Sequence, residues 1–376
     1  MTGVLFVDHA EALGGAEHSL LLLLRHLDRS RFRPLLACNR GPLAEAATAL
    51  DVPVILVEMP RIRGEALGPL RLLRGSQALA RLIRRRQVDI VHSNVMRASF
   101  YAALAARLTG RPLVWHVRDI HPPSERWYTR LMCRLATRVI AISQAVAAAL
   151  PCPHKVTVVY NGLDLEEYPP ELEGAVVRAE LGLPLDAPVA GIVGRLQAWK
   201  GQERFLRAAV QVAERLPQAR FLVVGGAIFG DGEAYAAGLR HLATDLGLGE
   251  RVIFTGHRQD LPRLLAALDV LVHCAEAEPF GRVLIEGMAA RRPVVAFADG
   301  AVPEIVRHEE MGLLVPPGDE PALAAAMVEL LGDAQRRQRM GVAGRHRVEQ
   351  HFTAAQTARA IEAIYCLVAE DPMLPR

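Results

Sequence analysis

Short apolar runs of strand length recur along the whole chain, and segments with helical spacing separate them. Strands that alternate with helices predict a parallel sheet with helices on both faces. In the first half, the expected strands are Val4–Asp8, Pro34–Ala37, Val54–Val57, Ile90–His92, Leu113–Val117, Val139–Ile142 and Val156–Tyr160. In the second half, they are Val189–Val193, Phe221–Val224, Val252–Thr255, Val270–His273, Val294–Phe297 and Gly312–Val315. The predicted fold class is therefore α/β, with two doubly wound, Rossmann-like halves.

The 376 residues are enough for two domains, each with its own core. Asn161-Gly162 is a turn signal, and an acidic, proline-containing stretch follows it. We therefore predict an N-terminal domain over residues 1–165 and a C-terminal domain over residues 166–350. The stretch from Gly344 to Cys366 has apolar residues at helical spacing, so we expect it to be largely terminal helix. Two such halves would leave a cleft, which is a common place for a small-molecule site.

Composition narrows the function classes. A net charge of +3 is too small to indicate nucleic acid as a partner. The five cysteines are widely spaced and contain no Cys-x-x-Cys, which favours a reduced, cytoplasmic protein without disulfides or a zinc site. No segment reaches the length of a membrane span, and the N-terminus has no cleavage signal.

Two carboxylates flank a predicted helix start in the stretch Glu278-Pro279-Phe280-Gly281-Arg282-Val283-Leu284-Ile285-Glu286. Pro279 suits the first turn of a helix, because its missing N–H would have no partner there. We therefore expect a helix over Phe280–Ala290, with Glu278 in the loop before it and Glu286 about two turns inside. The free N–H groups of a helix N-terminus favour anions. The stretch would thus suit a ligand that carries both phosphates and hydroxyls.

A cation pair follows the first strand of the second half. Arg195 and Lys200 lie after Val189–Val193, and Lys200 is one of only two lysines in the chain. Arginine binds a diphosphate bidentately, and lysine binds it as a point charge. Ionised carboxylates such as Glu278 and Glu286 accept hydrogen bonds from sugar or ribose hydroxyls. The four side chains are complementary to a nucleotide sugar, although each by itself would also suit a surface ion pair.

The sequence contains no Asp-x-Asp, the short acidic signature that holds a divalent metal on a nucleoside diphosphate. Arg195 and Lys200 would therefore have to stabilise a leaving diphosphate without a metal. We expect no cofactor and no metal site.

Three features of the first half are less specific. Gly14-Gly15 lies between a strand and a helix, where it would be either a phosphate-binding loop or a plain tight turn. His116 stands at a strand end, where a histidine is either catalytic or structural. The arginine-rich helix Leu70–Gln87 would be either a solvated face or a peripheral contact with an anionic membrane.

The second half resembles the retaining glycosyltransferases of family four, which have the two-domain GT-B fold. The most specific match is the Glu-x7-Glu signature at Glu278 and Glu286. The other matching pieces are Gly194-Arg195-Leu196…Lys200-Gly201, Val223-Val224-Gly225-Gly226, Phe254-Thr255-Gly256, Pro303-Glu304-Ile305-Val306, Gly14-Gly15-Ala16-Glu17, Val158-Val159-Tyr160-Asn161-Gly162 and Gly312…Val315-Pro316-Pro317-Gly318-Asp319. The resemblance covers nearly the whole chain and is stronger after residue 156.

The resemblance implies roles for residues that match the family's motifs. Arg195 and Lys200 would bind the donor diphosphate, Glu278 the transferred sugar and Glu286 the ribose. Further donor-binding positions would be Gly15, Phe280, Gly281 and Val283, with Arg258 in the segment that holds the base. His116 would lie near the transferred sugar as a catalytic residue, beside Arg195, Lys200 and Glu278. The last helix, at residues 351–370, would cross back to the first domain.

The implied reaction is transfer of a sugar from a UDP- or GDP-sugar type donor, with retention, in cell-envelope glycolipid or polysaccharide synthesis. The acceptor stays open between a sugar, a lipid-linked sugar and a small metabolite. An epimerase-type enzyme that needs no acceptor and a non-catalytic nucleotide-sugar-binding module are the alternatives. A phosphorylase is disfavoured because neither lysine has the expected setting for pyridoxal phosphate. A dinucleotide dehydrogenase is disfavoured because the Gly-x-Gly-x-x-Gly fingerprint is missing.

Overall fold

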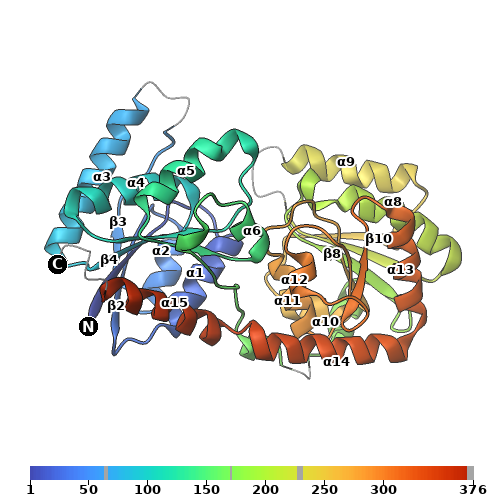
Figure 1. The fold of residues 1–376 in the computed structure, drawn as a ribbon. Helices are drawn as coiled ribbons and strands as arrows, with labels where there is room; N and C mark the ends of the chain where they lie inside the picture. The colour runs from blue at the N-terminus through green and yellow to red at the C-terminus, as the bar shows by residue number, and fades with distance from the viewer. Residues whose placement is uncertain (63–66, 170–171, 227–231, 371–376) are drawn as a thin grey trace. The chain divides into compact units, whose positions relative to one another are not determined.

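The computed structural model describes residues 1–62, 67–169, 172–226 and 232–370 (Figure 1). Residue contacts divide the chain into two compact units. The N-terminal unit comprises Met1–Leu163 and the chain from Phe352 onward, and the C-terminal unit comprises Asp164–His351. The chain thus leaves the N-terminal unit once and returns to it once.

The N-terminal unit is built on a seven-stranded sheet in the order β3-β2-β1-β4-β5-β6-β7, with every neighbouring pair parallel. Its strands are β1 Thr2–Val7, β2 Phe32–Cys38, β3 Val54–Leu56, β4 Ile90–Ser93, β5 Leu113–Val117, β6 Arg138–Ala141 and β7 Val156–Val158. Val4 to Val7 in β1 have no exposed surface, because β1 is an interior strand with both faces covered.

Helices cover both faces of this sheet (Figure 1). On one face lie α3 Gly68–Arg85, α4 Met96–Thr109 and α5 Arg126–Leu135. On the other lie α1 Gly15–His26, α2 Pro42–Ala49 and the last helix, α15 Ala354–Ala369. The short helix α6 is Gln144–Ala148. Helix α15 packs beside α1 and contributes Ile361 and Tyr365 to the buried core of this unit.

The C-terminal unit has a six-stranded parallel sheet in the order β10-β9-β8-β11-β12-β13. Its strands are β8 Val189–Val193, β9 Arg220–Val224, β10 Val252–Gly256, β11 Val270–His273, β12 Val294–Phe297 and β13 Gly312–Val315. Its helices are α7 Ala175–Glu180, α8 Gln202–Arg215, α9 Gly232–Asp245, α10 Leu261–Ala267, α11 Arg282–Ala289, α12 Val302–Ile305, α13 Glu320–Gly332 and α14 Ala334–His351. Helices α8, α9 and α13 cover one face, and α10, α11 and α14 lie on the other (Figure 1).

Both sheets reverse their strand order next to their first strand. In the N-terminal unit, β1 lies between β2 and β4, and in the C-terminal unit, β8 lies between β9 and β11. The connections on the two sides of such a switch point run to opposite faces of the sheet, which leaves a crevice at the carboxyl ends of the two strands. The predicted α/β class, with two doubly wound sheets, is confirmed.

The stretch from Gly344 to Cys366 is largely helical, as predicted, but it forms two helices. Helix α14 ends at His351, and α15 begins at Ala354. The side chain of Thr353 accepts a hydrogen bond from the backbone N–H of Gln356, and the Gln356 side chain returns to the backbone N–H of Thr353. This capping box satisfies N–H groups that a new helix start leaves without partners, so it favours a break at this point.

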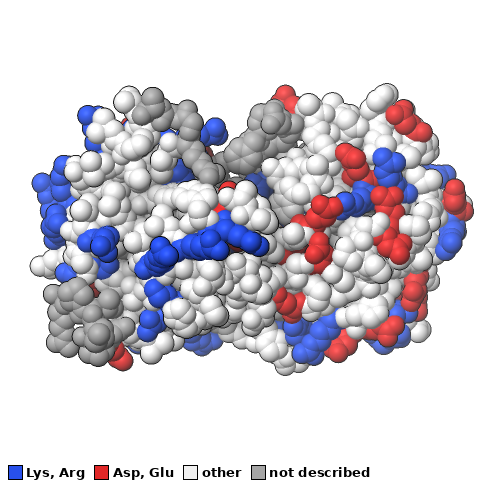
Figure 2. Space-filling model, turned by 45° about the horizontal axis from the view of Figure 1, so that its top comes forward, with Lys and Arg blue, Asp and Glu red and all other residues white. Residues whose placement is uncertain are grey.

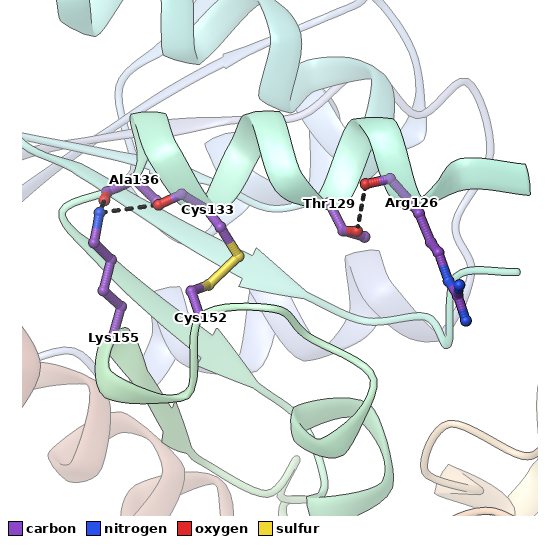
Figure 3. The surroundings of a disulfide bond; sticks show 6 residues. All are labelled: Arg126, Thr129, Cys133, Ala136, Cys152 and Lys155. Atoms are coloured by element: carbon purple, nitrogen blue, oxygen red, sulfur yellow. Dashed lines mark hydrogen bonds between the residues drawn. A yellow bond between two sulfur atoms is a disulfide. The ribbon is translucent and has the colours of Figure 1, made fainter. Parts of the chain in front are cut away.

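The prediction of a protein without disulfides is contradicted. Cys133 on α5 and Cys152 form a disulfide with a Cα–Cα distance of 5.9 Å across 19 residues of sequence (Figure 3). The loop before β7 returns to the end of α5 and brings the two thiols together, which no local Cys-x-x-Cys spacing signals. In the same place, Lys155 Nζ donates to the carbonyl oxygens of Cys133 and Ala136 (Figure 3).

Candidate active site

The switch point of the C-terminal sheet brings a lysine and a glutamate together. Lys200 ends a short 3-10 turn, Ala198–Lys200, after β8, and Glu278 lies in the loop after β11. Lys200 Nζ donates to Glu278 Oε2 at 2.7 Å, although the residues are 78 apart in sequence. The parallel pairing of β8 with β11 makes this contact, because it sets their carboxyl ends side by side.

A glycine fixes the position of Lys200. Gly201 follows it with φ 74°, the left-handed region that favours glycine. A Cβ at Gly201 would lie 2.3 Å from the carbonyl oxygen of Cys274, so no side chain fits there. The backbone N–H of Glu276 also donates to the carbonyl oxygen of Trp199. The turn is thus packed directly on the loop that carries Glu278.

Glu278 is buried, with 5% of its surface exposed. Burial raises the pKa of its carboxyl, but His273 and Lys200 outweigh that effect and hold the pKa well below its usual range. His273 Nε2 lies 3.2 Å from Glu278 Oε2, and the backbone N–H of Gly281 donates to Oε1 at 3.0 Å. The carboxylate is therefore ionised and rigidly held, and it acts as a hydrogen-bond acceptor.

Helix α11 begins later than the sequence indicated. Its first residue is Arg282, so Pro279 and Phe280 belong to the preceding loop and Pro279 is not in the first turn. Gly281 is the N-cap with φ 80°, and a Cβ there would lie 2.7 Å from Leu284 Cδ1. The left-handed residue at this point ends the loop and sets the helix direction. Val283 is then in the first turn, where backbone N–H groups have no acceptor within the helix.

Glu286 lies in the second turn of α11, as predicted, and is 6% exposed. Arg282 Nε donates to its Oε1 at 2.7 Å across one helical turn. Burial raises the pKa of the Tyr168 hydroxyl, and the nearby Glu286 carboxylate raises it further. Glu286 therefore lies one turn beyond the start of α11, and one of its carboxylate oxygens accepts a hydrogen bond from Arg282.

Two further predicted residues of this unit are Arg195 and Arg258. Arg195 is exposed in the loop after β8, and its carbonyl oxygen accepts a hydrogen bond from Gln202. Arg258 is held in ion pairs with Glu180 and Asp260, at 2.5 Å and 2.6 Å. Two carboxylates thus already neutralise the Arg258 guanidinium. The structure does not bring Arg258 into the group around Lys200.

Two predicted residues lie in the N-terminal unit. Gly15 begins α1, and a Cβ added to it would meet nothing within 4 Å, so the space above its backbone is open. The Gly14 N–H before it donates to the Glu17 carboxylate at 2.8 Å. His116 lies near the carboxyl end of β5, is 3% exposed, and has its Nδ1 3.2 Å from His92 Nε2.

Comparisons with known proteins agree with this architecture. The family profile "Glycosyl transferases group 1" matches residues 175–347, and "Glycosyltransferase Family 4" matches residues 13–167. Together they cover most of both units. The chain belongs to glycosyltransferase family 4.

Several relatives and solved structures are similar to this family 4 glycosyltransferase. The D-inositol 3-phosphate glycosyltransferase of Mycobacteroides abscessus is 39% identical over 48% of this chain, a match that spans 40% of that protein. The lipopolysaccharide core biosynthesis mannosyltransferase LpsB of Rhizobium meliloti is 30% identical over 63% of this chain and 68% of its own length. The crystal structure of Anabaena Alr3699/HepE in complex with UDP and glucose has a TM-score of 0.85 and 30% identity. It covers 97% of this chain and 100% of that chain.

Three residues around these sites were not singled out from the sequence. Arg282 donates to Glu286, His273 lies beside Glu278, and Tyr365 joins the histidines of the N-terminal unit. A histidine at the end of β11, five residues before Glu278, was a signal that could have been used. Tyr365 gave no local signal, because its partner His92 is 273 residues away.

Replacing Lys200 with Met removes the cation beside Glu278. Burial then raises the pKa of the Glu278 carboxyl with less opposition, so this pKa should rise. NMR of the Glu278 carboxyl carbon through a pH titration measures this pKa. A glutamate whose pKa is lowered in the folded state stabilises the fold at pH values above 4.5, its ordinary pKa. This stabilisation is lost as the pH falls below 4.5 toward the lowered pKa. The melting temperatures of wild type and variant should therefore differ most at neutral pH and converge below 4.5.

Lys155→Met is the matched control, because Lys155 donates to backbone carbonyls in the other unit. It should leave the Glu278 titration at its wild-type position. An unchanged Glu278 pKa in Lys200→Met would contradict a contribution of Lys200 to the low pKa of Glu278.

Proposed function

We propose that this glycosyltransferase moves a sugar from a nucleoside-diphosphate sugar to a hydroxyl acceptor with retention at the anomeric carbon. The observation that carries the proposal is the lysine–glutamate pair at the β8/β11 switch point, beside the start of α11. A UDP-sugar donor is favoured, because the similar HepE structure was solved with UDP-glucose and with UDP and glucose. A GDP-sugar donor is the other candidate.

Lys200 and Arg195 would stabilise the departing diphosphate. A lysine ammonium has three N–H donors, and Glu278 uses one of them at 2.7 Å. Lys200 can therefore keep its carboxylate partner and still donate to phosphate oxygens. Arg195, exposed on the loop from the same strand, would add a second cation. Two cations at the leaving group would supply the charge that a metal supplies in other transferases, so we propose a metal-independent reaction.

The two glutamates would bind different parts of the donor. Glu278, ionised and acceptor-only, would hold hydroxyls of the transferred sugar, and Glu286 would accept from the ribose with the oxygen that Arg282 leaves open. The N–H groups at the start of α11, near Gly281 and Val283, would meet phosphate, with Phe280 beside them. In the N-terminal unit, Gly15 would approach the diphosphate and His116 the sugar.

The proton of the acceptor hydroxyl would pass to the leaving phosphate on the same face of the sugar. Lys200 already engages the buried Glu278 carboxylate, which makes that carboxylate a poor nucleophile. A reaction on one face keeps the configuration of the anomeric carbon, which is the basis for proposing retention.

The direct test is incubation with UDP-glucose and candidate hydroxyl acceptors, followed by NMR of the product's anomeric proton. The product should have the donor's anomeric configuration. Arg195→Ala should lower turnover by about 100-fold or more, as for loss of one leaving-group donor. The control is Arg207→Ala, an exposed arginine on α8, which should turn over normally.

An inverted product would contradict retention, and near-normal turnover in Arg195→Ala would contradict its role. Conversion of the sugar nucleotide to an isomer without any acceptor would instead indicate an epimerase. Binding of the donor without any turnover would indicate a non-catalytic module.

A lipid-linked acceptor at an anionic membrane surface would fit the outer face of α3. This helix exposes Leu70 and Leu73, each at 42%, beside the exposed Arg74. Figure 2 shows Lys and Arg side chains gathered on the visible face of the N-terminal unit, with few Asp and Glu side chains among them. Within the described parts of the chain, we find no helix that could span a bilayer. We therefore propose a peripheral contact through the predicted segment Leu70–Gln87, in cell-envelope glycolipid synthesis.

Flotation with vesicles that contain anionic phospholipid tests this contact. The protein should float with the vesicles at low salt and less at high salt, since charge attraction is screened. A double variant, Leu70→Gln with Leu73→Gln, should weaken flotation, because it removes the apolar part of the face. The control, Leu367→Gln, changes a leucine that is 59% exposed on α15, on the other face of the sheet of the same unit. No flotation of wild type at low salt would exclude the membrane contact.

A further inference from the structure

A line of hydrogen-bonded rings runs through the N-terminal unit from its last helix to the end of its sheet. The Tyr365 hydroxyl on α15 lies 2.7 Å from His92 Nδ1. His92 Nε2 on β4 lies 3.2 Å from His116 Nδ1 on β5. All three side chains are buried, His92 and Tyr365 completely. Distances alone allow the hydrogens to point along this line in either direction.

Arg118 removes that ambiguity. Its Nη2 lies 3.4 Å from His116 Nδ1, and a guanidinium can only donate. The guanidinium is itself fixed, because it donates to Asn94 Oδ1 at 2.7 Å and 2.9 Å and to Asn161 Oδ1 at 3.0 Å. His116 Nδ1 must therefore present its lone pair.

The charge state of the two rings follows from the same surroundings. Burial and the nearby Arg118 cation lower the pKa of His92 to about 3 and hold the pKa of His116 well below its usual value. Both imidazoles are neutral at physiological pH, so each carries one hydrogen. Since His116 Nδ1 accepts, the hydrogen of His116 is on Nε2. His92 then donates from Nε2 and accepts on Nδ1 from the Tyr365 hydroxyl.

The end of this line has no protein partner. His116 Nε2 is buried and makes no hydrogen bond within the part of the chain that the structure describes. A buried N–H without an acceptor is costly, and natural proteins keep few of them unless a ligand uses them. A suitable acceptor for the His116 Nε2–H group is a neutral or negative oxygen atom, such as a sugar hydroxyl oxygen.

We propose that Arg118, His92 and Tyr365 are positioning residues that hold His116 as its Nε2–H tautomer, so that His116 offers substrate a hydrogen-bond donor and cannot act as a general base. The tautomer stands on the hydrogen bonds alone, whereas its use toward a sugar hydroxyl rests on the proposed function. Helix α15 thereby has a role in the site, because Tyr365 supplies the donor that completes the line.

Two-bond proton–nitrogen NMR of the imidazole rings in the full-length protein tests the tautomer. His92→Gln and His116→Gln assign the two rings among the 13 histidines. Both rings should show a protonated Nε2 and a bare Nδ1 that do not change across the neutral pH range. A proton on His116 Nδ1, or titration of His116 near neutral pH, would overturn the proposal whatever the enzyme's substrate.

Substitutions test the positioning role. In Arg118→Met, the hydrogens of the line can point in either direction, so the His116 ring should become a mixture of its two neutral tautomers. The nitrogen chemical shifts of His116 should change accordingly. Turnover of the donor sugar should fall about ten-fold, the scale of one lost hydrogen bond, while binding of free UDP, which has no sugar to contact, should not change. Arg118→Lys keeps a donor and should restore both the spectrum and much of the turnover.

Tyr365→Phe should lower turnover more mildly and keep the His116 tautomer, because Arg118 still sets it. The control is Tyr128→Phe, a buried tyrosine of the same unit outside the line, which should be neutral. Wild-type turnover in Arg118→Met despite a mixed tautomer would overturn the positioning role. If wild type keeps the expected tautomer but transfers no sugar, the proposed function fails and the tautomer assignment stands.

Discussion

A buried, ionised carboxylate at a sheet switch point is the constraint on which the C-terminal unit depends. Glu278 is almost completely buried, and a lone carboxylate in that position would be protonated or would destabilise the fold. Lys200 and the Gly281 N–H donate to this carboxylate, and His273 Nε2 lies 3.2 Å from it. They come from three separate segments after β8, on β11 and before α11. The Glu278 carboxylate therefore contacts all three segments and fixes their positions relative to one another.

The N-terminal unit satisfies its polar groups in a related way. There the fixed charge is Arg118, whose guanidinium bonds two asparagine oxygens and faces His116. Burial and the Arg118 cation keep His92 and His116 uncharged. The direction in which each hydrogen bond of the line is donated is therefore set by the positions of donors and lone pairs. The final helix takes part, since Tyr365 arrives after the chain has passed through the whole C-terminal unit. Folding of the N-terminal unit thus depends on residues from both ends of the chain.

The sequence predicted those features that follow from local pattern. Strand positions came from apolar runs, and the joint position of Lys200 and Glu278 came from the rule that loops after parallel strands share one edge. Features set by distant contacts were missed. The disulfide between Cys133 and Cys152 depends on the return of a loop to α5, and Tyr365 depends on a partner 273 residues away.

One local prediction failed because the backbone overrode side-chain preference. Pro279 suits a first helical turn, but the left-handed Gly281 delays the helix to Arg282. The terminal stretch is largely helical, as predicted, and the Thr353 capping box starts its second helix. Arg258 was placed near the base by resemblance alone, and its carboxylate partners Glu180 and Asp260 carry no pattern that would have shown the pairing.

The division of work between the two glutamates is the central claim about the site, and calorimetry with UDP and UDP-glucose tests it most directly. Glu286→Ala should weaken both ligands by roughly 10- to 100-fold, because both contain the ribose. Glu278→Ala should weaken UDP-glucose by a similar factor and leave UDP unchanged or tighter, since Lys200 is then released toward the diphosphate. Equal losses of UDP binding in the two variants would contradict the assignment of Glu278 to the sugar and Glu286 to the ribose.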